Sequence, residues 1–436
     1  ELGGYSSDIS MRSAVPEQEL ISLDNYRLRH SHYKLDPDLR ALHQQYAFLS
    51  IWDDHESSDN AYKDGAYNHQ ANEGSWQERK AAAVKAYMEW MPVRENPEFD
   101  QRIYRKFSYG KLVDLYMLDT RLEGRDEQVA IGSPDISSAE RRLLGDEQFN
   151  WLRQEMLSSK AQWKVLAQQV MMAPLRIGGL SINTDQWDGY TFERDRLFAF
   201  WQKEKMENLV VLTGDIHSSW ASDLPTKAYN PVKDTGSVGV EFVCTSVTSP
   251  GMEIPVAEQA LLLNNPHLKF SNLSKRGYMV LVIDSLRAQA EWYFSETVLE
   301  KNSRHQFGKA FYAEKGKPFL KESKRESIPK ASQIALAPNE PQGGFSNLEE
   351  EYVFTVFGLY PNPFSSSFQM QFFSSTSTPA VLRMYSDNGA EIKRIKIAPH
   401  IGVNYLEVKT QELPSGFYTI SLEIAGEIKG YSLIKK

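Results

Sequence analysis

Four titratable residues stand side by side in one short segment of the chain. The stretch LSIWDDHESSDN, residues 49–60, carries Asp53, Asp54, His55 and Glu56 directly after an apolar run. Acidic side chains near the start of a helix satisfy its unpaired N–H groups and its dipole, so helix capping is one interpretation. The other is a site that binds cations or transfers protons, because carboxylates and imidazole are the groups that do this chemistry.

A second group of such residues follows another apolar run. In NLVVLTGDIHSSW, residues 208–220, Asp215 and His217 come directly after Gly214. Sites rich in oxygen with few nitrogens suit calcium, manganese or iron better than a thiolate site would. Two metals about 3.5–4 Å apart hold the attacking and leaving oxygens of a phosphoryl transfer. The presence of two clusters therefore favours metal binding over capping.

The two clusters need a rigid framework that brings them together. Short apolar runs predict strands, and segments with helical periodicity alternate with them. The expected strands are 47–52, 102–110, 113–120, 163–170 and 209–212, and the expected helices are 24–46 with a break at Pro37, 75–90 and 139–158. Such alternation indicates an α/β layer architecture, in which ligands bind beyond the carboxyl ends of the strands. The acid-bearing turns are therefore expected to meet at one edge of a sheet.

Bulk properties narrow the class of protein. The chain has 436 residues, which predicts two to three domains. Its net charge of −8, from 49 basic and 57 acidic residues, gives no basic surface for nucleic acid. No stretch approaches the roughly 18 to 20 apolar residues of a transmembrane helix. The single cysteine, Cys244, cannot form an internal disulfide and leaves the compartment undecided.

The character of the sequence changes after about residue 300. Residues 301–352 are rich in lysine, glutamate and serine and read as a tail and charged linker. Short alternating segments follow, with turn signals at Asp387-Asn388-Gly389 and Ala425-Gly426, which predict a small all-β domain over 353–436. The expected organisation is therefore an α/β domain over 1–300, this linker, and the all-β domain.

Seven blocks in the first domain carry a family resemblance. They are IWDDHE, LYMLDTR, WKVLAQQVMMAP, DQWDGY, LTGDIHSSW, EFVCTSVTSPG and SKRGYMVLVID. In this order they resemble the PhoD-like alkaline phosphatases of the metallophosphoesterase superfamily, over about residues 1–295. The resemblance implies a four-layer α/β/β/α sandwich with a metal centre at the carboxyl ends of its strands.

The resemblance also implies an activity. It indicates a secreted metal-dependent phosphatase that hydrolyses phosphate monoesters by in-line attack of a metal-activated hydroxide. A phosphodiesterase or phospholipase-D-type enzyme of the same fold is an alternative, and a non-catalytic surface protein that binds ligands is another.

Matched position by position, the resemblance suggests metal ligands. Asp54, Asp215 and His217 correspond to residues that hold the metal pair. Asp53 would be a direct ligand or would orient one, and Asn60 is a weaker ligand candidate. The family's metals are calcium and iron, so these two are the expected cofactors.

Catalytic and substrate-binding roles follow from the same matching. His55 would lie beside the phosphate and either stabilise charge or protonate the leaving oxygen, with Asp54 as its catalytic neighbour. Arg121, in LYMLDTR, has two interpretations: a bidentate contact to a phosphate oxygen, or a structural ion pair with a nearby acid.

One part of the family pattern is missing. Relatives carry an earlier Gly-Asp cluster and a preceding cysteine that together hold the iron. Residues 1–23 contain no such cluster, and Cys244 lies far downstream of the expected position. We therefore expect the sequence to be an N-terminally truncated family member that lacks about half of the ligands, with correspondingly weaker metal binding.

The C-terminal domain resembles a different family. VFGLYPNPFSSSF, MYSDNGAEI and LPSGFYTISLEIAGEIKGYSLIKK look like a type A sorting domain of the bacterial type IX secretion system, an immunoglobulin-like β domain. The resemblance implies export by that machinery across the outer membrane, a secreted or surface-anchored product, and a source among the Bacteroidetes. A generic β-sandwich binding module is the alternative.

Overall fold

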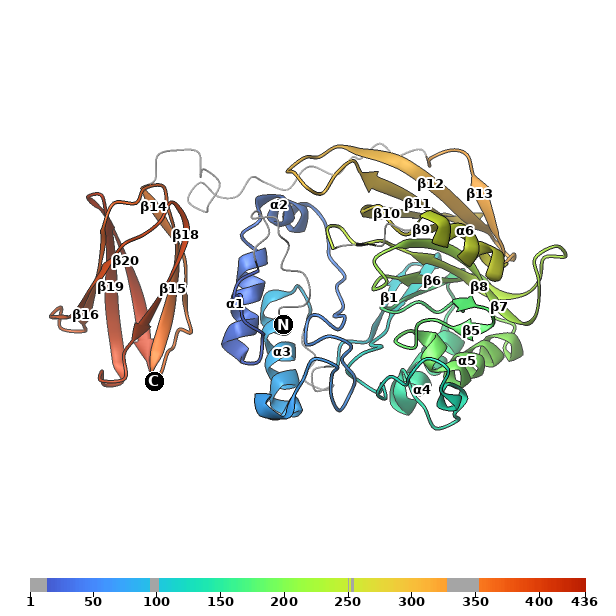
Figure 1. The fold of residues 1–436 in the computed structure, drawn as a ribbon, viewed down its shortest axis with the longest axis horizontal. Coiled ribbons are helices and arrows are strands. Elements are labelled where there is room, and N and C mark those ends of the chain that lie inside the picture. The colour runs from blue at the N-terminus through green and yellow to red at the C-terminus, as the bar shows by residue number, and fades with distance from the viewer. Residues whose placement is uncertain (1–13, 95–101, 250, 252–254, 328–352) are drawn as a thin grey trace. The chain divides into compact units, whose positions relative to one another are not determined.

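The computed structural model describes residues 14–94, 102–249, 251, 255–327 and 353–436 (Figure 1). The chain divides into two compact units, Glu1–Ala335 and Leu336–Lys436. None of the helices in the described parts of the chain has the length and apolar character needed to cross a bilayer.

A mixed sheet of seven strands forms the centre of the first unit (Figure 1). Its strands, in spatial order, are β1 (Arg105–Tyr109), β2 (Val113–Met117), β3 (Trp163–Ala167), β6 (Leu209–Thr213), β8 (Thr235–Val243), β7 (Ser219–Asn230) and β9 (Leu268–Asn272). The neighbours β2, β3, β6 and β8 run parallel. The predicted strands at 102–110, 113–120, 163–170 and 209–212 are thereby confirmed, and three of them end at the same edge.

In the parts of the chain that the structure describes, six α-helices and three short 3-10 helices accompany the sheets. The α-helices are α1 (Leu23–Tyr33), α2 (Pro37–Gln45), α3 (Trp76–Trp90), α4 (Gly145–Ser158), α5 (Thr191–Lys203) and α6 (Pro255–Asn264). The 3-10 helices are η2 (Ala71–Glu73), η3 (Pro134–Ser137) and η4 (Trp187–Gly189). The break expected at Pro37 is confirmed: Pro37 opens α2, where its missing N–H costs nothing, and the Asp36 side chain caps it.

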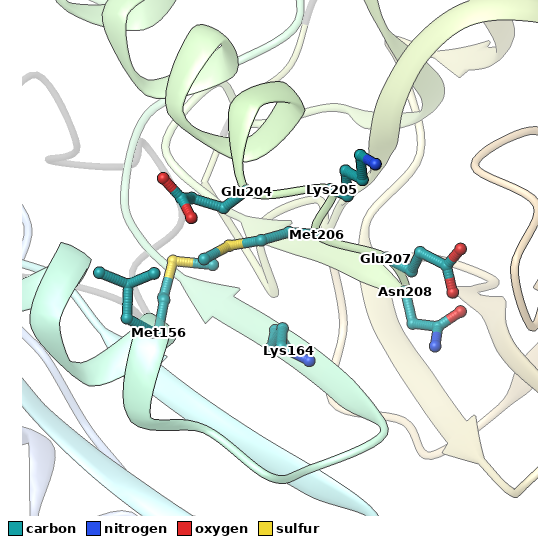
Figure 2. Close-up of a pocket in the computed structure, with 8 residues that line it drawn as sticks. Met156, Lys164, Glu204, Lys205, Met206, Glu207 and Asn208 are labelled. Atoms are coloured by element: carbon teal, nitrogen blue, oxygen red, sulfur yellow. The ribbon is translucent and has the colours of Figure 1, made fainter.

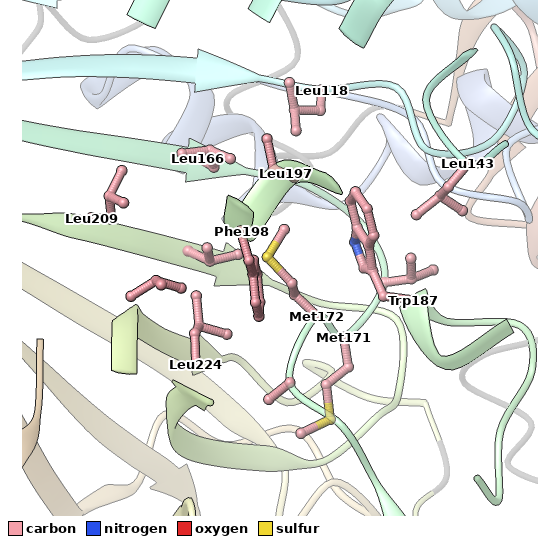
Figure 3. Close-up of a cluster of buried hydrophobic side chains, with 14 of the residues drawn as sticks. Leu118, Leu143, Leu166, Met171, Met172, Trp187, Leu197, Phe198, Leu209 and Leu224 are labelled. Atoms are coloured by element: carbon pink, nitrogen blue, oxygen red, sulfur yellow. The ribbon is translucent and has the colours of Figure 1, made fainter. Parts of the chain in front are cut away.

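The helix predicted for 139–158 begins later, at Gly145. The amides before it bond to side chains instead of starting the helix: Leu143 and Leu144 both donate to the carboxylate of Glu193, at 2.5 and 2.9 Å. These bonds satisfy the backbone without helical geometry. Helices α4 and α5 then pack their apolar residues onto one face of the seven-stranded sheet (Figure 3).

A second, antiparallel sheet packs against the other face of the seven-stranded sheet. Its strands are β10 (Gly277–Ile283), β11 (Arg287–Ser295), β12 (His305–Glu314) and β13 (Leu320–Ser323), in that order. Trp163 and Val210 from the first sheet share a buried core with Ala290 and Trp292 from the second. A small hairpin of β4 (Arg176–Ile177) and β5 (Leu180–Ser181) completes the unit.

Two expectations from the sequence were wrong here. The prediction of a tail and linker for 301–352 fails in its first part, because β12 and β13 lie within it. Phe311 and Ala313 are buried in the core between the sheets, and pairing with β11 satisfies the polar backbone. Its last residues, 328–352, lie outside the described part of the chain.

The predicted strand at 47–52 is also wrong, because this segment is extended but joins neither sheet. Side chains bind its carbonyl groups instead. The guanidinium of Arg105 donates to the carbonyl of Ser50 at 2.6 Å, and the amide of Gln169 donates to that of Trp52 at 2.7 Å. The loop that follows, with its cluster of acids, is therefore attached by side-chain contacts and not by a sheet ladder.

The second unit is all-β, as predicted. One sheet contains β14 (Phe354–Tyr360), β15 (Ser367–Ser374) and β18 (Gly402–Lys409), and the other contains β17 (Glu391–Ile397), β16 (Ala380–Ser386), β19 (Gly416–Ile424) and β20 (Glu427–Lys435). Both sheets contribute to one buried core, which includes Phe372 and Ile420. The predicted hairpin turns are confirmed: Ala425 and Gly426 have φ of 49° and 88°, as a type I′ turn requires, and Gly389 has φ of 83°, as in a longer hairpin loop that ends in a left-handed residue.

Candidate metal centre

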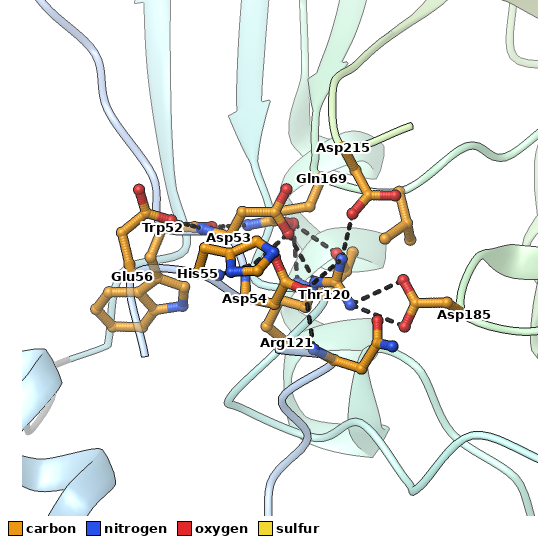
Figure 4. A network of polar contacts seen from close by, with 12 residues as sticks. Trp52, Asp53, Asp54, His55, Glu56, Thr120, Arg121, Gln169, Asp185 and Asp215 are labelled. Carbon is orange, nitrogen blue, oxygen red and sulfur yellow. Dashed lines mark hydrogen bonds and ion pairs between the residues drawn. The ribbon is translucent and has the colours of Figure 1, made fainter. Parts of the chain in front are cut away.

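The guanidinium of Arg121 lies among carboxylates from three separate turns at the carboxyl edge of the large sheet (Figure 4). Its Nε donates to Asp53 at 2.6 Å, and its Nη2 donates to Asp215 at 2.5 Å. Its Nη1 donates to both oxygens of Asp185, at 3.0 and 2.9 Å. Because Arg121 is fully buried, these ion pairs are shielded from water and hold the three turns together.

The loop that carries Asp54 folds around that side chain. One carboxylate oxygen accepts from the backbone N–H of His55 at 2.8 Å, and the other accepts from that of Asn60 at 2.9 Å. The carbonyl of Asp54 accepts from the amides of Ser57 and Ser58, both at 2.7 Å. With only 5% of its surface exposed, Asp54 is held in one orientation, and each oxygen retains further acceptor capacity.

A strained turn presents Asp215 to the same place. Directly after β6, Asp215 and His217 have positive φ, 63° and 52°, which is uncommon for residues other than glycine. A hydrogen bond of 2.8 Å from the amide of Ile216 to the carbonyl of Gly214 closes a tight turn around Asp215. Such conformations persist where surrounding contacts enforce them, as the ion pair to Arg121 does here.

Asp185 is a member of this cluster that the sequence did not single out. Besides Arg121, its side chain accepts from Arg125 at 2.5 Å and from Gln128 at 2.8 Å. It belongs to the block DQWDGY, whose second aspartate, Asp188, instead forms a buried ion pair of 2.7 Å with Arg194. Two aspartates three positions apart thus have different environments, and no sequence pattern distinguishes them.

The charges of the cluster are not balanced. Burial opposes ionisation of Asp185, but Arg121 and Arg125 outweigh it and lower its pKa to about 2. For Asp215, burial raises the pKa well above its usual range, although Arg121 acts against it. Neighbouring carboxylates add to this rise. The cluster therefore holds more acid than its guanidinium groups neutralise, and a further cation would relieve the excess.

The acids also have the geometry of cation ligands. Among the described residues, two groups of three have one ligand atom each within 4.8 Å of the others: Asp53, Asp54 and Asp215, and Asp54, His55 and Asp59. The first group offers only oxygens, whereas the second includes an imidazole. Asp54 belongs to both and has two carboxylate oxygens. The residues thus fit a pair of hard or borderline metal ions that share one carboxylate.

Only some of the residues that the sequence suggested as ligands or catalytic groups lie in the two groups of possible cation ligands. Asp53, Asp54, His55 and Asp215 lie together as expected, whereas neither group of cation ligands includes His217. The backbone carbonyl of His217 accepts from the Thr245 hydroxyl at 3.3 Å, and its role as a ligand stays a prediction.

Two further residues contact the cluster in other ways. Asn60 bonds to Asp54 through its backbone, so the ligand role of its side chain also stays a prediction. Arg121 forms the structural ion pairs that were one of its two interpretations, with Asp53 and Asp215. Its contact with a phosphate oxygen, the other interpretation, stays a prediction.

A hollow of about 320 Å³ lies at the opposite end of the strands (Figure 2). Lys164 and Asn208, which line it, stand at the amino ends of β3 and β6. Its other lining residues combine methionines with charges of both signs. Because the acid cluster follows the carboxyl ends of these strands, this hollow is not part of it.

Comparison with known proteins agrees with this arrangement. Residues 3–292, which include all the acids of the cluster, match the family model described as PhoD-like phosphatase. The chain belongs to this family. Residues 358–436 match the model of a secretion system C-terminal sorting domain, which indicates export.

Alignment with individual relatives shows which share of each protein this PhoD-like chain covers. It is 36% identical to alkaline phosphatase D of Bacillus subtilis (strain 168) over 299 residues, or 65% of this chain and 50% of that protein. A solved structure titled "Structure of PhoD" has 33% identity and a TM-score of 0.66, and the match covers 73% of this chain and 62% of that one. The mixed α/β fold with its large central sheet is therefore that of PhoD, and the chain spans about half the length of its Bacillus relative.

Proposed function

We propose that this chain is the catalytic part of an exported, metal-dependent phosphatase that hydrolyses phosphate monoesters. Its membership of the PhoD-like family supports a phosphoric ester hydrolase, and its Bacillus relative bears the name alkaline phosphatase D. The observation that carries the proposal is the position of Asp54, which belongs to both groups of cation ligands. A carboxylate shared in this way is suited to hold two metals at the short separation that phosphoryl transfer uses.

In this proposal each residue of the cluster has a separate task. Asp53, Asp54 and Asp215 hold the cations, with Asn60 and His217 as additional ligands. A metal pair held by these residues would polarise the phosphoryl oxygens and lower the pKa of a water molecule, the chemistry that in-line displacement of the ester oxygen needs.

The remaining groups of the site act on the substrate and on the ligands. His55, two residues after Asp53, protonates the departing oxygen or stabilises its charge. Arg121 fixes the spacing of Asp53 and Asp215 through its ion pairs, and any contact with phosphate is additional.

The identity of the metals is part of the proposal. The all-oxygen group of Asp53, Asp54 and Asp215 is suited to calcium. The imidazole of His217, an additional ligand in this proposal, is a nitrogen donor, which iron accepts readily. We therefore propose calcium and iron as the cofactors.

The finer architecture and the route of export are also proposals. We expect the complete four-layer α/β/β/α sandwich of the metallophosphoesterases in the first unit and an immunoglobulin-like topology in the second. We propose a phosphatase domain that extends beyond residue 300 to include β12 and β13, a connecting segment before residue 353 and a sorting domain over 353–436. Type IX machinery is the proposed transport partner.

The test is a comparison of two substrates under defined metal conditions. The 436-residue chain is assayed with p-nitrophenyl phosphate and with bis(p-nitrophenyl) phosphate, after chelation and again after calcium and iron are restored. We expect faster hydrolysis of the monoester, loss of activity on chelation and recovery with metal. Faster hydrolysis of the diester would favour the phosphodiesterase alternative, and metal binding with no hydrolysis of either ester would indicate a binding protein.

A further inference from the structure

The side chain of Gln169 joins turns that are distant in the sequence (Figure 4). Its Nε2 donates to the carbonyls of Trp52 at 2.7 Å and Leu118 at 3.0 Å. Its Oε1 accepts from the amide of Thr120 at 3.0 Å and from the hydroxyl of Thr120 at 2.6 Å. Its own backbone carbonyl accepts from the amide of Gly214 at 3.0 Å. Gln169 therefore contacts three turns: the one that carries Asp53 and Asp54, the one that carries Arg121 and the one that carries Asp215.

The partners of Gln169 have a common position in the sequence. Three of them directly precede a charged member of the cluster, since Asp53, Arg121 and Asp215 are the residues that follow. A shift of any of these backbone groups would thus move a charged side chain by a similar amount. Coordination tolerates displacements of only about 0.5 Å before productive geometry is lost.

A primary amide is suited to this task in a way that few side chains are. It has two N–H donors and one oxygen with two lone pairs, and here both donors and both lone pairs are used. The contact to Trp52 matters most, because segment 47–52 belongs to neither sheet and lacks a ladder to fix it. Without the amide, its carbonyl and that of Leu118 would both lose a buried donor.

We propose that Gln169 is a positioning residue for the metal centre: it sets the distance between the turn that carries Asp53 and Asp54 and the turn that carries Arg121. The inference rests on the proposed function, because it concerns the same site. It assigns Gln169 no contact with substrate or metal. Its side chain fixes two of the three turns, whereas the third depends on its backbone and should survive substitution.

The neighbouring residue provides a matched control. Gln168 is equally buried, with 5% exposure against 4% for Gln169. Its amide also donates two hydrogen bonds, to Val170 and Thr213, and it accepts one, from Trp187. A methionine at either position keeps the length of the side chain and removes all its hydrogen bonds, so Gln168→Met and Gln169→Met should lose comparable stability.

The experiment measures calcium affinity by titration calorimetry and backbone hydrogen exchange by mass spectrometry, both on the full 436-residue chain. Gln169→Met should bind Ca²⁺ about 10- to 100-fold more weakly than the unmodified chain, the usual effect of losing an outer partner of a metal site. Peptides that cover residues 50–60 and 118–123 should exchange faster, and a peptide over 213–217 should not. Gln168→Met should keep its Ca²⁺ affinity within about two-fold.

The outcomes separate the two claims. Equal Ca²⁺ affinities for the two variants, or unchanged exchange at 50–60 and 118–123, would overturn the positioning role while leaving the proposed function intact. An unmodified chain that binds no Ca²⁺ would overturn the proposed function, and with it the inference. If Gln169→Met does not fold, Thr120→Val serves instead: it removes one of the four bonds, and it should weaken Ca²⁺ binding several-fold, whereas an unchanged affinity would contradict the proposal.

Discussion

Arg121 and Asp215, 94 positions apart in the chain, form an ion pair of 2.5 Å at the carboxyl edge of the central sheet. The same guanidinium contacts Asp53 and Asp185, and its whole surface is buried. Burial alone would lower the pKa of Arg121, but the surrounding carboxylates raise it well above its usual value. Arg121 is thus a permanent internal cation, placed against acids that also have the geometry to bind metal.

Replacing Arg121 should make the protein more dependent on metal. In Arg121→Gln the buried acids lose their partner, which should lower the free energy of unfolding of the metal-free chain by about 3–5 kcal/mol. A bound cation would neutralise the same acids, so calcium should raise the melting temperature of this variant more than that of the unmodified chain. Thermal unfolding with and without Ca²⁺ measures both effects. An equal or smaller calcium effect in the variant would show that Arg121 and the metal do not share these carboxylates.

Removing one carboxylate ligand should stop turnover without unfolding the chain. Hydrolysis of p-nitrophenyl phosphate should fall to the background rate in Asp54→Asn and in Asp215→Asn, because each variant loses a proposed carboxylate ligand. The same is expected of His217→Ala, which loses a proposed imidazole ligand. Asp195→Asn, at a side chain that is 57% exposed, serves as the control and should keep full activity. Circular dichroism monitors the fold. Activity retained in His217→Ala would remove that residue from the site, and activity retained in Asp54→Asn would remove the shared ligand.

The convergence of the acids could be predicted because it depends on local patterns. Apolar runs of strand length precede Asp119 and Asp215, and parallel strands bring their ends to one edge. Among the described residues, however, Asp119 belongs to neither group of cation ligands. Its carboxylate accepts hydrogen bonds from the backbone amides of Arg121 and Leu122, at 2.8 and 2.9 Å, and so shapes the turn. The pattern thus located the turn correctly but could not tell which of its side chains faces the site.

The parts that escaped prediction depend on contacts between distant residues. Segment 47–52 has the composition of a strand, yet its carbonyls bond to Arg105 and Gln169, which lie far along the chain. Asp185 does not follow a strand of the seven-stranded sheet, and it joins the cluster through its contacts with Arg121 and Arg125. Such relations arise from the tertiary arrangement and leave no periodic signal.

Glu193 should give the fold a specific dependence on pH. Burial raises its pKa from 4.5 to about 7, although the amides of Leu143 and Leu144 act in the opposite direction. The unfolded chain then releases this proton at lower pH than the folded chain, so the free energy of unfolding falls as pH rises from about 4.5 to about 7. Glu193→Gln keeps an acceptor for both amides and removes this contribution, which is at most about 3 kcal/mol.

Urea unfolding across this pH range measures the difference between the two proteins. As pH rises, the free energy of unfolding of Glu193→Gln should increase relative to that of the unmodified chain. A constant cost is subtracted from this gain, because the new amide group is buried where one oxygen of Glu193 has no hydrogen-bond partner. A substitution at the exposed Glu140 should leave the pH profile unchanged. Parallel profiles for Glu193→Gln and the unmodified chain would show that Glu193 ionises normally in the folded state.

Asn362 should control the stability of the sorting domain alone. Its Oδ1 accepts from the amide of Ile434 at 2.9 Å, and its Nδ2 donates to the carbonyl of Ser432 at 3.2 Å, so the entry loop of this unit holds its last strand, β20. Asn362→Ala removes both bonds and should cost about 1–2 kcal/mol. Asn362→Asp keeps the acceptor and loses the donor, and it should have a smaller effect.

Two probes can separate the units in this experiment, because all nine tryptophans lie at or before Trp292. Tryptophan fluorescence therefore follows the phosphatase unit, whereas limited proteolysis with mass analysis detects cleavage within 353–436. We expect Asn362→Ala to speed cleavage in the sorting domain and to leave the fluorescence transition unchanged, since the bonds it removes lie entirely within that domain. A shift of the fluorescence transition would mean that the two units unfold as one, and unchanged cleavage would mean that β20 is held without Asn362.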